Sequence, residues 1–401
     1  MKKHILVISQ YFYPEQFRIN DIASEWVKRG YKVTVLTGIP NYPQGKFFEG
    51  YSWTKKRKEV WNGVEIIRIP LIARGKNAIG MILNYLSFVL SGFLWKCFTD
   101  IKADVVFTFE VSPMTQALIG VWYSKKHKIP HYLYVQDLWP ENVEIVTGIH
   151  HKAIIGPISK MVNYIYKNCH MILATSPSFV EKIRERVKDK PEKVICWPQY
   201  AEEFYTPQEK KLTPEIPADD RFKIIFTGNV GYAQGLSVLP QTALCLKNNN
   251  VENVCFVIVG DGRYKQQLLD EIAACAVSDM FVMVDRQPAE KIPELLAACD
   301  VAFVSFMNDQ LFEWTIPAKL QSYMACGMPV VGAARGETVR VIKEAQCGVY
   351  CDAGDSEALT KEILSIMNRK DLRALGENAR RYYEEHFAKK KLMDQIERII
   401  F

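Results

Sequence analysis

The feature that most restricts the fold of this chain is a repeated alternation of apolar segments with helical ones. Apolar segments such as HILVISQYF (4–12) and KVTVLTG (32–38) have no polar face, which is typical of strands buried on both sides of a sheet. Helical stretches separate them, for example NDIASEWVKRG (20–30), a capped helix that ends at glycine. Such a series predicts a parallel sheet covered by helices on both faces.

The alternation occurs twice, so the 401 residues are predicted to form two doubly wound α/β domains. Further strands of the first series are expected at 65–70, 104–110, 130–137 and 171–176, with a helix around 113–127. The second series has expected strands at 223–231, 255–262, 280–286, 300–306 and 329–333. A charged, proline-bearing piece, 201–220, indicates a linker. The predicted domains are 1–200 and 221–375, followed by helices (376–401) that can pack back on the N-terminal domain.

Charge is unevenly distributed along the chain. Residues 1–200 hold 28 lysines and arginines against 16 acidic residues, whereas 201–401 hold 23 against 29. The basic half indicates an anionic partner, namely nucleic acid, a membrane surface or a phosphorylated substrate, unless it is only a solvated basic face. Ten cysteines without a CxxC framework indicate reduced thiols in the cytosol and predict no zinc site.

One segment departs from the composition of a soluble domain. NAIGMILNYLSFVLSGFLW (77–95) is 19 residues long without a charge, and Lys76 and Lys96 bracket it. This is about the length of a spanning helix, but two asparagines and two serines dilute it. A buried or interface-lying helix therefore fits better than a transmembrane one, especially with the basic run 55–58 nearby in the sequence.

The stretch TIPAKLQSYMACGMPVV (315–331) predicts a helix with abrupt ends. Thr315 can cap its start, Pro317 suits its first turn, and Gly327 can end it. Lys319 lies in the opening turn, where the helix dipole disfavours a cation. A bound anion explains this lysine, and a surface lysine tolerated at slight cost is the alternative.

Glycine-bearing turns follow two strands of the second series, in FTGNVGYAQGL (226–236) and VGDGR (259–263). Glycine lets backbone N–H groups approach phosphate oxygens closely, although tight turns after strands use glycine in any case. The expected nucleotide-binding residues are Gly228, Asn229, Gly231, Gln234, Gly260, Asp261, Gly262, Arg286, Thr315, Ile316, Pro317, Ala318 and Ser322.

Several motifs occur together in an order typical of one enzyme family. In the second half they are GNVGYAQGL, VGDG, AACDV, PAKLQSYMACGMPVV and RGETVRVIKEAQCGVY. In combination they resemble the nucleotide-sugar domain of glycosyltransferase family 4, a retaining family with the GT-B fold, in which two Rossmann-like domains face a cleft. In the first half QYFYPE, RGYKVTVLTGIPNYPQG and VQDLWPEN are similar to a branch that builds bacterial O-antigens and capsules. The resemblance covers nearly the whole chain.

The sequence departs from this family pattern where the donor diphosphate would bind. The second of the family's two glutamates is replaced by Ser322, and the usual arginine and lysine that clamp the diphosphate are replaced by Asn229 and Gln234. Lys319 and Arg18 are the cations that remain available for this task.

The resemblance implies retaining, metal-independent transfer of a hexosamine-type sugar, with N-acetyl-L-fucosamine as one candidate. The donor would be a UDP-sugar, without a cofactor, and the acceptor a lipid-diphosphate-linked saccharide in O-antigen or capsule assembly. Lys319 and Arg18 are expected to neutralise diphosphate, Arg18 on either the donor or the acceptor. Asp137 and Glu141 are expected to line the hexose or acceptor pocket, unless Glu141 only begins a helix.

An undecaprenyl-diphosphate-linked acceptor would place the protein in the cytoplasm, peripherally on the anionic inner leaflet of the cell membrane, with no role for nucleic acid. Two other functions remain open at this point. One is a nucleotide-sugar epimerase, which needs no acceptor, and the other is a catalytically inactive nucleotide-sugar-binding partner.

Overall fold

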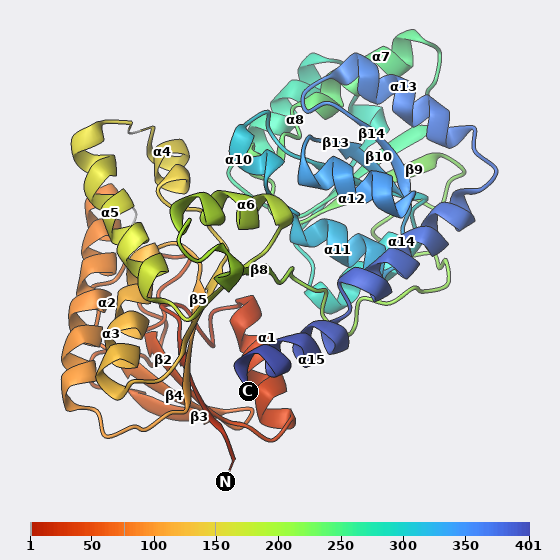
Figure 1. Cartoon of the computed structure of the whole chain (residues 1–401). Coiled ribbons are helices and arrows are strands. Elements are labelled where there is room, and N and C mark those ends of the chain that lie inside the picture. The colour runs from red at the N-terminus through yellow and green to blue at the C-terminus, as the bar shows by residue number, and fades with distance from the viewer. Residues whose placement is uncertain (1, 76, 149) are drawn as a thin grey trace. The chain divides into compact units, whose positions relative to one another are not determined.

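Two sheets composed mainly of parallel strands organise the chain (Figure 1). The computed structural model describes residues 2–75, 77–148 and 150–401, so Lys76 lies outside the described residues. One unit comprises Met1–Trp197 with Ile400, and the other comprises Pro198–Ile399 with Phe401. Each unit covers both faces of its own sheet with helices, which confirms the predicted pair of Rossmann-like α/β units.

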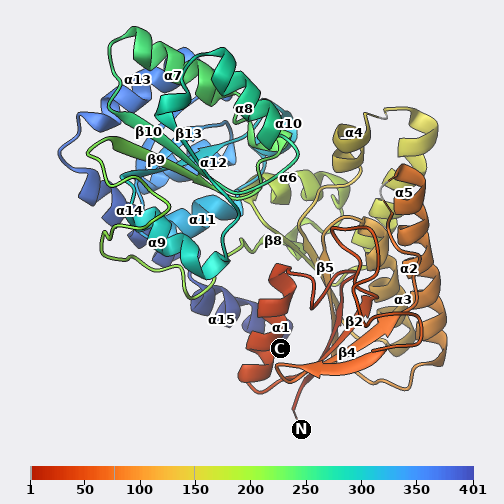
Figure 2. The same cartoon turned by 180° about the vertical axis from the view of Figure 1, so that it is seen from behind.

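The eight strands of the first unit lie in the order β3-β4-β2-β1-β5-β6-β7-β8, and only the β3–β4 pair is antiparallel. The strands are His4–Ile8 (β1), Lys32–Gly38 (β2), Lys58–Trp61 (β3), Val64–Ile69 (β4), Val105–Glu110 (β5), His131–Val135 (β6), Met171–Ala174 (β7) and Val194–Cys196 (β8). The helices are Arg18–Lys28 (α1), Ala78–Phe98 (α2), Ala117–His127 (α3), Glu141–Thr147 (α4), Lys152–Asn168 (α5) and Pro177–Arg186 (α6). Helices α2, α3 and α5 follow one face of the sheet, and α1 lies on the opposite face (Figures 1 and 2).

The first unit differs from the sequence prediction in the short strands β3 and β8, which were not predicted, and in the start of α1. Strand β3 was missed because it is a short, partly exposed edge strand, joined to β4 by the turn residues Asn62 and Gly63, both at positive φ. Helix α1 begins earlier than predicted, at Arg18, after an extended Phe17 that makes no side-chain cap. Arg18 therefore lies in the first turn of a helix, at the carboxyl edge of the sheet.

The second unit has six parallel strands in the order β11-β10-β9-β12-β13-β14. The strands are Phe222–Thr227 (β9), Val254–Val259 (β10), Phe281–Val284 (β11), Val301–Ser305 (β12), Val330–Ala333 (β13) and Gly348–Cys351 (β14). The helices are Val238–Asn248 (α7), Lys265–Ala274 (α8), Ile292–Ala297 (α9), Gln310–Glu313 (α10), Ala318–Ala325 (α11), Glu337–Ala345 (α12), Ser356–Met367 (α13), Leu372–His386 (α14) and Lys389–Ile400 (α15). The order reverses between β9 and β12, which is where doubly wound sheets bind ligands.

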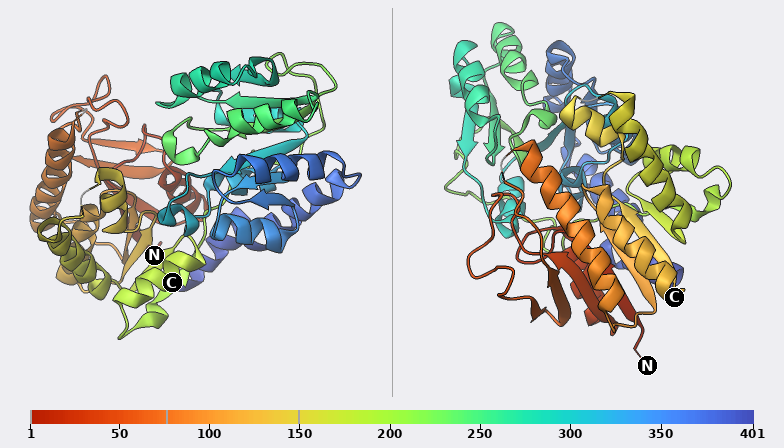
Figure 3. Two further views of the ribbon diagram at one scale, coloured as in Figure 1. Left: turned by 90° about the horizontal axis from the view of Figure 1, so that it is seen from above. Right: turned by 90° about the vertical axis from the view of Figure 1, so that its left-hand side faces the viewer.

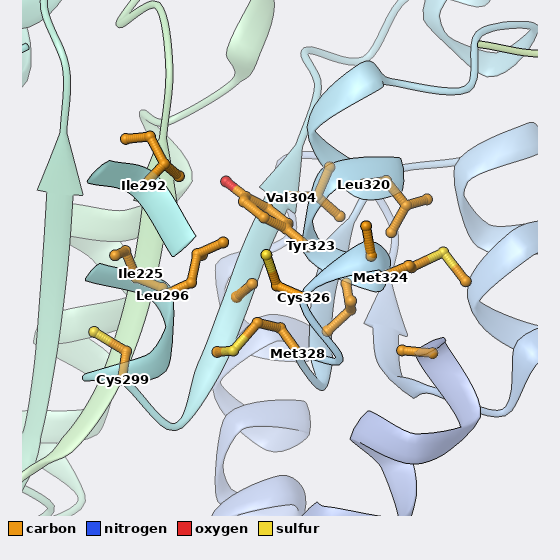
Figure 4. Close-up of a cluster of buried hydrophobic side chains, with 14 of the residues drawn as sticks. Ile225, Ile292, Leu296, Cys299, Val304, Leu320, Tyr323, Met324, Cys326 and Met328 are labelled. Atoms are coloured by element: carbon orange, nitrogen blue, oxygen red, sulfur yellow. The ribbon is translucent and has the colours of Figure 1, made fainter. Parts of the chain in front are cut away.

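The core on one face of this sheet holds α11 in place (Figure 4). Leu320 and Tyr323 of α11 are fully buried against Ile225 of β9 and Val304 of β12. The Tyr323 hydroxyl accepts a hydrogen bond from the backbone N–H of Thr227 at 2.9 Å. Because this bond ties α11 to the carboxyl end of β9, the start of α11 is held near the loop that follows β9.

Two glycines in helices of the first unit offer a matched test of packing. A Cβ atom on Gly92 of α2 would lie 2.2 Å from Cδ1 of Ile119 in α3, whereas one on Gly156 of α5 would meet no atom within 4 Å. We expect Gly92→Val to lower the free energy of unfolding by about 1–3 kcal/mol, because the added carbons overpack this contact. Gly156→Ala should leave it unchanged or raise it by up to about 1 kcal/mol through helix propensity. Urea unfolding of both variants checks this, and equal stability would contradict the close approach of α2 and α3.

Candidate functional site

The candidate site of the second unit lies where the strand order reverses. The loop that follows β9 packs against the end of β12 and the residues just after it. Ser305 Oγ donates to the Gln234 carbonyl at 2.5 Å, and the Met307 N–H donates to the Ala233 carbonyl at 3.1 Å. Gly235 adopts positive φ there, and a Cβ atom on it would lie 2.6 Å from the Phe306 carbonyl. These contacts fix the position of the β9 loop at the carboxyl edge of the sheet.

Lys319 reaches into this loop from the first turn of α11. Its Nζ donates a hydrogen bond to Gln234 Oε1 and lies 3.8 Å from the centroid of the Phe226 ring. A Cβ atom on Gly228 would lie 3.9 Å from the same Nζ. The structure therefore brings together Gly228, Gln234 and Lys319, three residues that the sequence assigned to the nucleotide site.

The ammonium group of Lys319 is a cation without a countercharge. Within the described part of the chain no carboxylate lies within 4.0 Å of it, although the side chain is only partly exposed to solvent. Burial lowers the pKa of Lys319 well below its ordinary value of 10.5. An uncompensated cation at this edge of the sheet favours an anionic ligand, which would restore the ordinary pKa.

The glycines of the two loops serve mainly to let the loops approach each other. A Cβ atom on Gly260 would lie 1.9 Å from the Gly228 carbonyl oxygen, and one on Gly262 would lie 2.2 Å from that of Val230. The N–H groups of Gly228 and Gly260 donate to the Val259 and Val284 carbonyls, both at 2.9 Å. These two N–H groups are thus engaged within the sheet edge, which corrects the expectation that they are free to bind phosphate.

The other predicted residues of these loops lie at the same edge. Asn229 is exposed beside Gly228, and Gly231 begins the short 3-10 turn that ends at Gln234. The backbone carbonyl of Asp261 accepts a hydrogen bond from the Val230 N–H at 2.9 Å. Arg286 is exposed just past β11 and follows the strand that pairs with β10.

The start of α11 differs from the prediction. Thr315 is not the N-cap, because Pro317 occupies that position with extended backbone and the Thr315 hydroxyl donates to the Leu311 carbonyl at 3.0 Å. Ile316 is a core residue and Ser322 is buried, with its hydroxyl bonded to the Ala318 carbonyl at 3.2 Å. At the start of α11, Ala318 is exposed to solvent and Lys319 is partly exposed. The predicted end is confirmed: Gly327 has φ +67°.

In the first unit, Asp137 lies just past β6. Its side chain is held by Ser112, two residues after the end of β5. Its Oδ2 accepts the Ser112 N–H at 2.7 Å, and the Ser112 hydroxyl accepts bonds from Trp139 Nε1 at 3.1 Å and Asn142 Nδ2 at 2.9 Å. Burial raises the pKa of Asp137 above its ordinary value. A carboxylate fixed in this way can accept a proton or hold a hydroxyl group.

Sequence reasoning missed a second carboxyl group in this region. Glu110 is fully buried at the end of β5, and burial together with the charge of Asp137 raises its pKa well above its ordinary value. Its place at the end of an otherwise apolar strand, VVFTFE, was the available signal. Glu110 ends β5 and Asp137 lies just past the neighbouring strand β6, so both carboxyl groups lie at this edge of the sheet.

Arg18 and Glu141 have different surroundings. Arg18 is half-buried in the first turn of α1, close enough to Tyr134 of β6 for its charge to lower the pKa of that phenol, which burial raises. Glu141 lies in the first turn of α4 and binds Arg186 of α6 at 2.7 Å. This ion pair supports the alternative in which Glu141 begins and braces a helix, so we do not place it in the reaction.

The Glu15 side chain holds the loop that contains Asn41 and Tyr42 through hydrogen bonds to its backbone. Glu15 Oε1 accepts the N–H groups of Asn41 and Tyr42 at 2.8 and 2.6 Å, and burial raises the pKa of this carboxyl to about 7. Asn41 itself is fully buried, with Oδ1 accepting the Arg74 N–H at 2.9 Å. Tyr42 remains exposed, and the Arg74 guanidinium lies 5.3 Å from its ring centroid.

Metal ligands do not gather in either unit. Among residues 2–75, 77–148 and 150–401, no group of three or more His, Cys, Asp and Glu side chains is arranged to hold a metal ion.

Two family models match the chain in series. Residues 17–199 match Glycosyltransferase Family 4, and residues 208–382 match Glycosyl transferases group 1. The chain is a GT-B glycosyltransferase of the family 4 type. Its sheet orders, with their two reversal points, agree with that architecture.

Individual relatives of this glycosyltransferase are distant. It is 26% identical over 385 residues to WcaI of Escherichia coli (strain K12), assigned to colanic acid biosynthesis, with 90% of this chain and 89% of WcaI covered. It is 23% identical over 292 residues to N-acetyl-alpha-D-glucosaminyl L-malate synthase of Bacillus anthracis, with 71% and 74% covered. Anabaena HepE, solved with UDP and glucose, superposes with a TM-score of 0.70 at 14% identity, with 99% of both chains covered.

The uncompensated charge of Lys319 leads to a stability test. We expect Lys319→Met to raise the free energy of unfolding at pH 7 by about 1–2 kcal/mol, because it removes a desolvated cation. The folded chain binds fewer protons at this site than the unfolded chain, so this gain should shrink as the pH is raised towards 10.5. Urea unfolding at pH 7 and pH 9.5 measures both effects.

Lys265→Met is the control, since Lys265 pairs with the exposed Asp285 at 2.8 Å and its loss should change stability little. A destabilised Lys319→Met variant would show that the ammonium group is already compensated without a ligand.

Proposed function

We propose that the chain is a retaining glycosyltransferase that moves a hexosamine-type sugar from a UDP-sugar to a lipid-diphosphate-linked saccharide in O-antigen or capsule assembly. The observation that carries the proposal is Lys319, an uncompensated cation held against Gly228 and Gln234 where the strand order of the second sheet reverses. A diphosphate supplies the missing negative charge. The site needs no cofactor other than the nucleotide sugar as substrate.

Three relatives support individual parts of this proposal. HepE was solved with UDP and glucose, which supports a uridine nucleotide as the donor. The Bacillus anthracis relative is named for an N-acetylglucosaminyl product, which supports an N-acetylated hexosamine. WcaI is assigned to colanic acid biosynthesis, which supports a role in surface polysaccharides.

Stabilisation of the leaving group is the main chemical task of the site. As the bond from the anomeric carbon to the phosphate oxygen breaks, negative charge builds up on the diphosphate, and a preorganised cation lowers the barrier by a few kcal/mol. Lys319 and the exposed helix start at Ala318 supply this positive potential in place of a metal ion. The acceptor hydroxyl bonds to the anomeric carbon from the same face, and its proton passes to the departing phosphate oxygen.

The acceptor belongs to the first unit in this proposal. Asp137 is the fixed carboxylate that orients the acceptor or donor hexose, and Arg18 neutralises a pyrophosphate from the first turn of α1. The protein acts in the cytoplasm, attached peripherally to the anionic inner leaflet, where an undecaprenyl-diphosphate-linked acceptor resides. The basic first half of the chain suits that surface.

Nucleotide binding tests the donor site directly. We expect UDP to bind the full chain in calorimetry, and Lys319→Ala to weaken UDP binding about tenfold or more and to lower kcat about 10²–10³-fold. Lys361→Ala, exposed on α13, should change neither. Full affinity and turnover of Lys319→Ala would contradict the proposal. Isomerisation of a UDP-sugar without acceptor would identify an epimerase, and UDP binding without any turnover an inactive partner.

The pH dependence of turnover tests Asp137. We expect Asp137→Asn to lower kcat about 10²-fold without changing UDP affinity. Because burial raises the pKa of Asp137, wild-type turnover should fall as the pH drops through that raised pKa and the carboxylate becomes protonated. The variant should lack this acidic limb. Glu141→Gln is the comparison, since loss of its pair with Arg186 should lower stability and leave turnover nearly unchanged.

A further inference from the structure

Helix α2 presents an exposed apolar stripe along its whole length. Large apolar side chains that are at least two-fifths exposed recur every few residues, and Ile79, Leu86 and Leu90 are 71%, 57% and 63% exposed. The full stripe is Ile79, Ile82, Leu83, Leu86, Leu90, Phe93, Leu94 and Phe98. A contiguous exposed apolar stripe of this kind marks a surface that binds a membrane, a ligand or another protein.

The opposite side of α2 packs on its own unit. Phe88 is fully buried in a cluster with Leu6 of β1 and Ile119 of α3, and Gly92 lets α2 approach Ile119 closely. Helix α2 is long and apolar enough to cross a membrane, by length and composition only. Because one side is held on the sheet, the exposed side suits a helix that lies along a membrane surface better than one that crosses it.

The helices beside α2 carry only positive charge. In the right-hand view of Figure 3 the orange and yellow helices α2, α3 and α5 lie side by side on one face of the first unit. None of the three contains an aspartate or a glutamate. Their charged residues are Lys96, Lys125, Lys126, Lys152, Lys160 and Lys167. Lysine-bearing helices without acidic residues, next to an apolar stripe, complement anionic lipid headgroups.

An exposed tryptophan extends this surface beyond α2. Trp53 is 55% exposed and donates through Nε1 to the Leu71 carbonyl at 2.9 Å, while the next residue, Ile72, donates its N–H to Ser87 Oγ of α2 at 2.9 Å. Trp53 therefore lies next to α2, with the basic run 55–58 just after it. Tryptophan is enriched at membrane–water interfaces, with lysines at headgroup level.

The inner edge of α2 reaches the carboxyl edge of the sheet. Asn84 is fully buried, with Oδ1 accepting Gln10 Nε2 at 2.7 Å just past β1. One side of α2 is thus largely exposed, while Asn84 on its other side joins the hydrogen bonds at the carboxyl edge of the sheet.

We propose that α2 is an in-plane membrane anchor, whose apolar stripe lies in the headgroup region of an anionic bilayer. The use of this anchor to reach a lipid-linked acceptor rests on the proposed function. The binding of α2 to lipid does not depend on the proposed function. The occupant of the stripe is the lipid surface and not a second copy of the chain, because two such lysine-bearing faces would repel each other.

A native cysteine reports on the position of α2. Cys97 lies within the stripe and is the one exposed thiol of the ten free cysteines. A polarity-sensitive fluorophore on Cys97 of the full chain should shift to shorter wavelength with vesicles of phosphatidylglycerol and phosphatidylethanolamine. Nitroxide groups near the headgroups should quench it more than nitroxide at the bilayer centre. An unchanged spectrum, or strongest quenching at the centre, would overturn the in-plane anchor.

Polar substitutions in the stripe provide the second test. The double variant Leu86→Asn with Leu90→Asn should weaken sedimentation with these vesicles about tenfold or more. Leu212→Asn, at an 82% exposed leucine in the second unit, should bind like the wild type. Vesicles of phosphatidylcholine alone should bind the wild type more weakly, since they lack anionic headgroups. Undiminished binding of the α2 variant would refute the proposal, as would a dimer that the variant dissociates while vesicle binding is unchanged.

UDP binding of the same variants separates this inference from the proposed function. The α2 variant should retain wild-type affinity for UDP, because its substitutions lie in the first unit and on exposed positions. Loss of vesicle binding with intact UDP binding supports the anchor. Wild-type protein that binds vesicles but not UDP would refute the proposed donor and leave the anchor in place.

Discussion

Parallel strand pairing is the constraint on which the rest of this structure depends. Parallel strands need crossover connections, so each sheet is covered by helices on both faces and all parallel strands end at one edge. The loops that leave that edge are the places where side chains from different parts of the chain meet. In the second unit this edge unites the loop after β9, the residues after β12 and the start of α11. In the first it unites Ser112 and Asp137.

The donor-site geometry then follows from how closely the backbone can approach at this edge. Gly228 and Gly260 lie against each other because neither has a Cβ atom, and Tyr323 ties α11 to the end of β9. As a result, the Lys319 ammonium group is held against a glutamine and an aromatic ring and not against a carboxylate. A cation in such a setting lowers the stability of the ligand-free protein, and an anionic ligand compensates its charge. The arrangement that lowers the stability of the protein without ligand thus favours binding of a diphosphate.

Helix α2 illustrates how a single element can connect two environments. Its buried side, Phe88 and Gly92, belongs to the core of the first unit, and its inner edge at Asn84 joins the hydrogen bonds past β1. Its outer side is exposed along the stripe, although Phe93 also packs edge-on against Trp122 of α3. The close approach at Gly92 leaves α2 little freedom to detach, so the apolar stripe is a fixed surface feature.

The sequence by itself determined the fold class, the two doubly wound units, the end of α11 at Gly327 and the grouping of Gly228, Gln234 and Lys319, because apolar alternation and glycine turns are local signals. It missed the short edge strands β3, β8 and β14. It also misplaced Thr315 as a cap, because the choice between neighbouring cap positions depends on α10. Only the tertiary structure decided that Glu141 pairs with Arg186, that Glu110 and Asp137 lie at the ends of neighbouring strands, and that α2 keeps one face exposed. These facts depend on contacts between residues far apart in the chain, which spacing along one strand or helix does not encode.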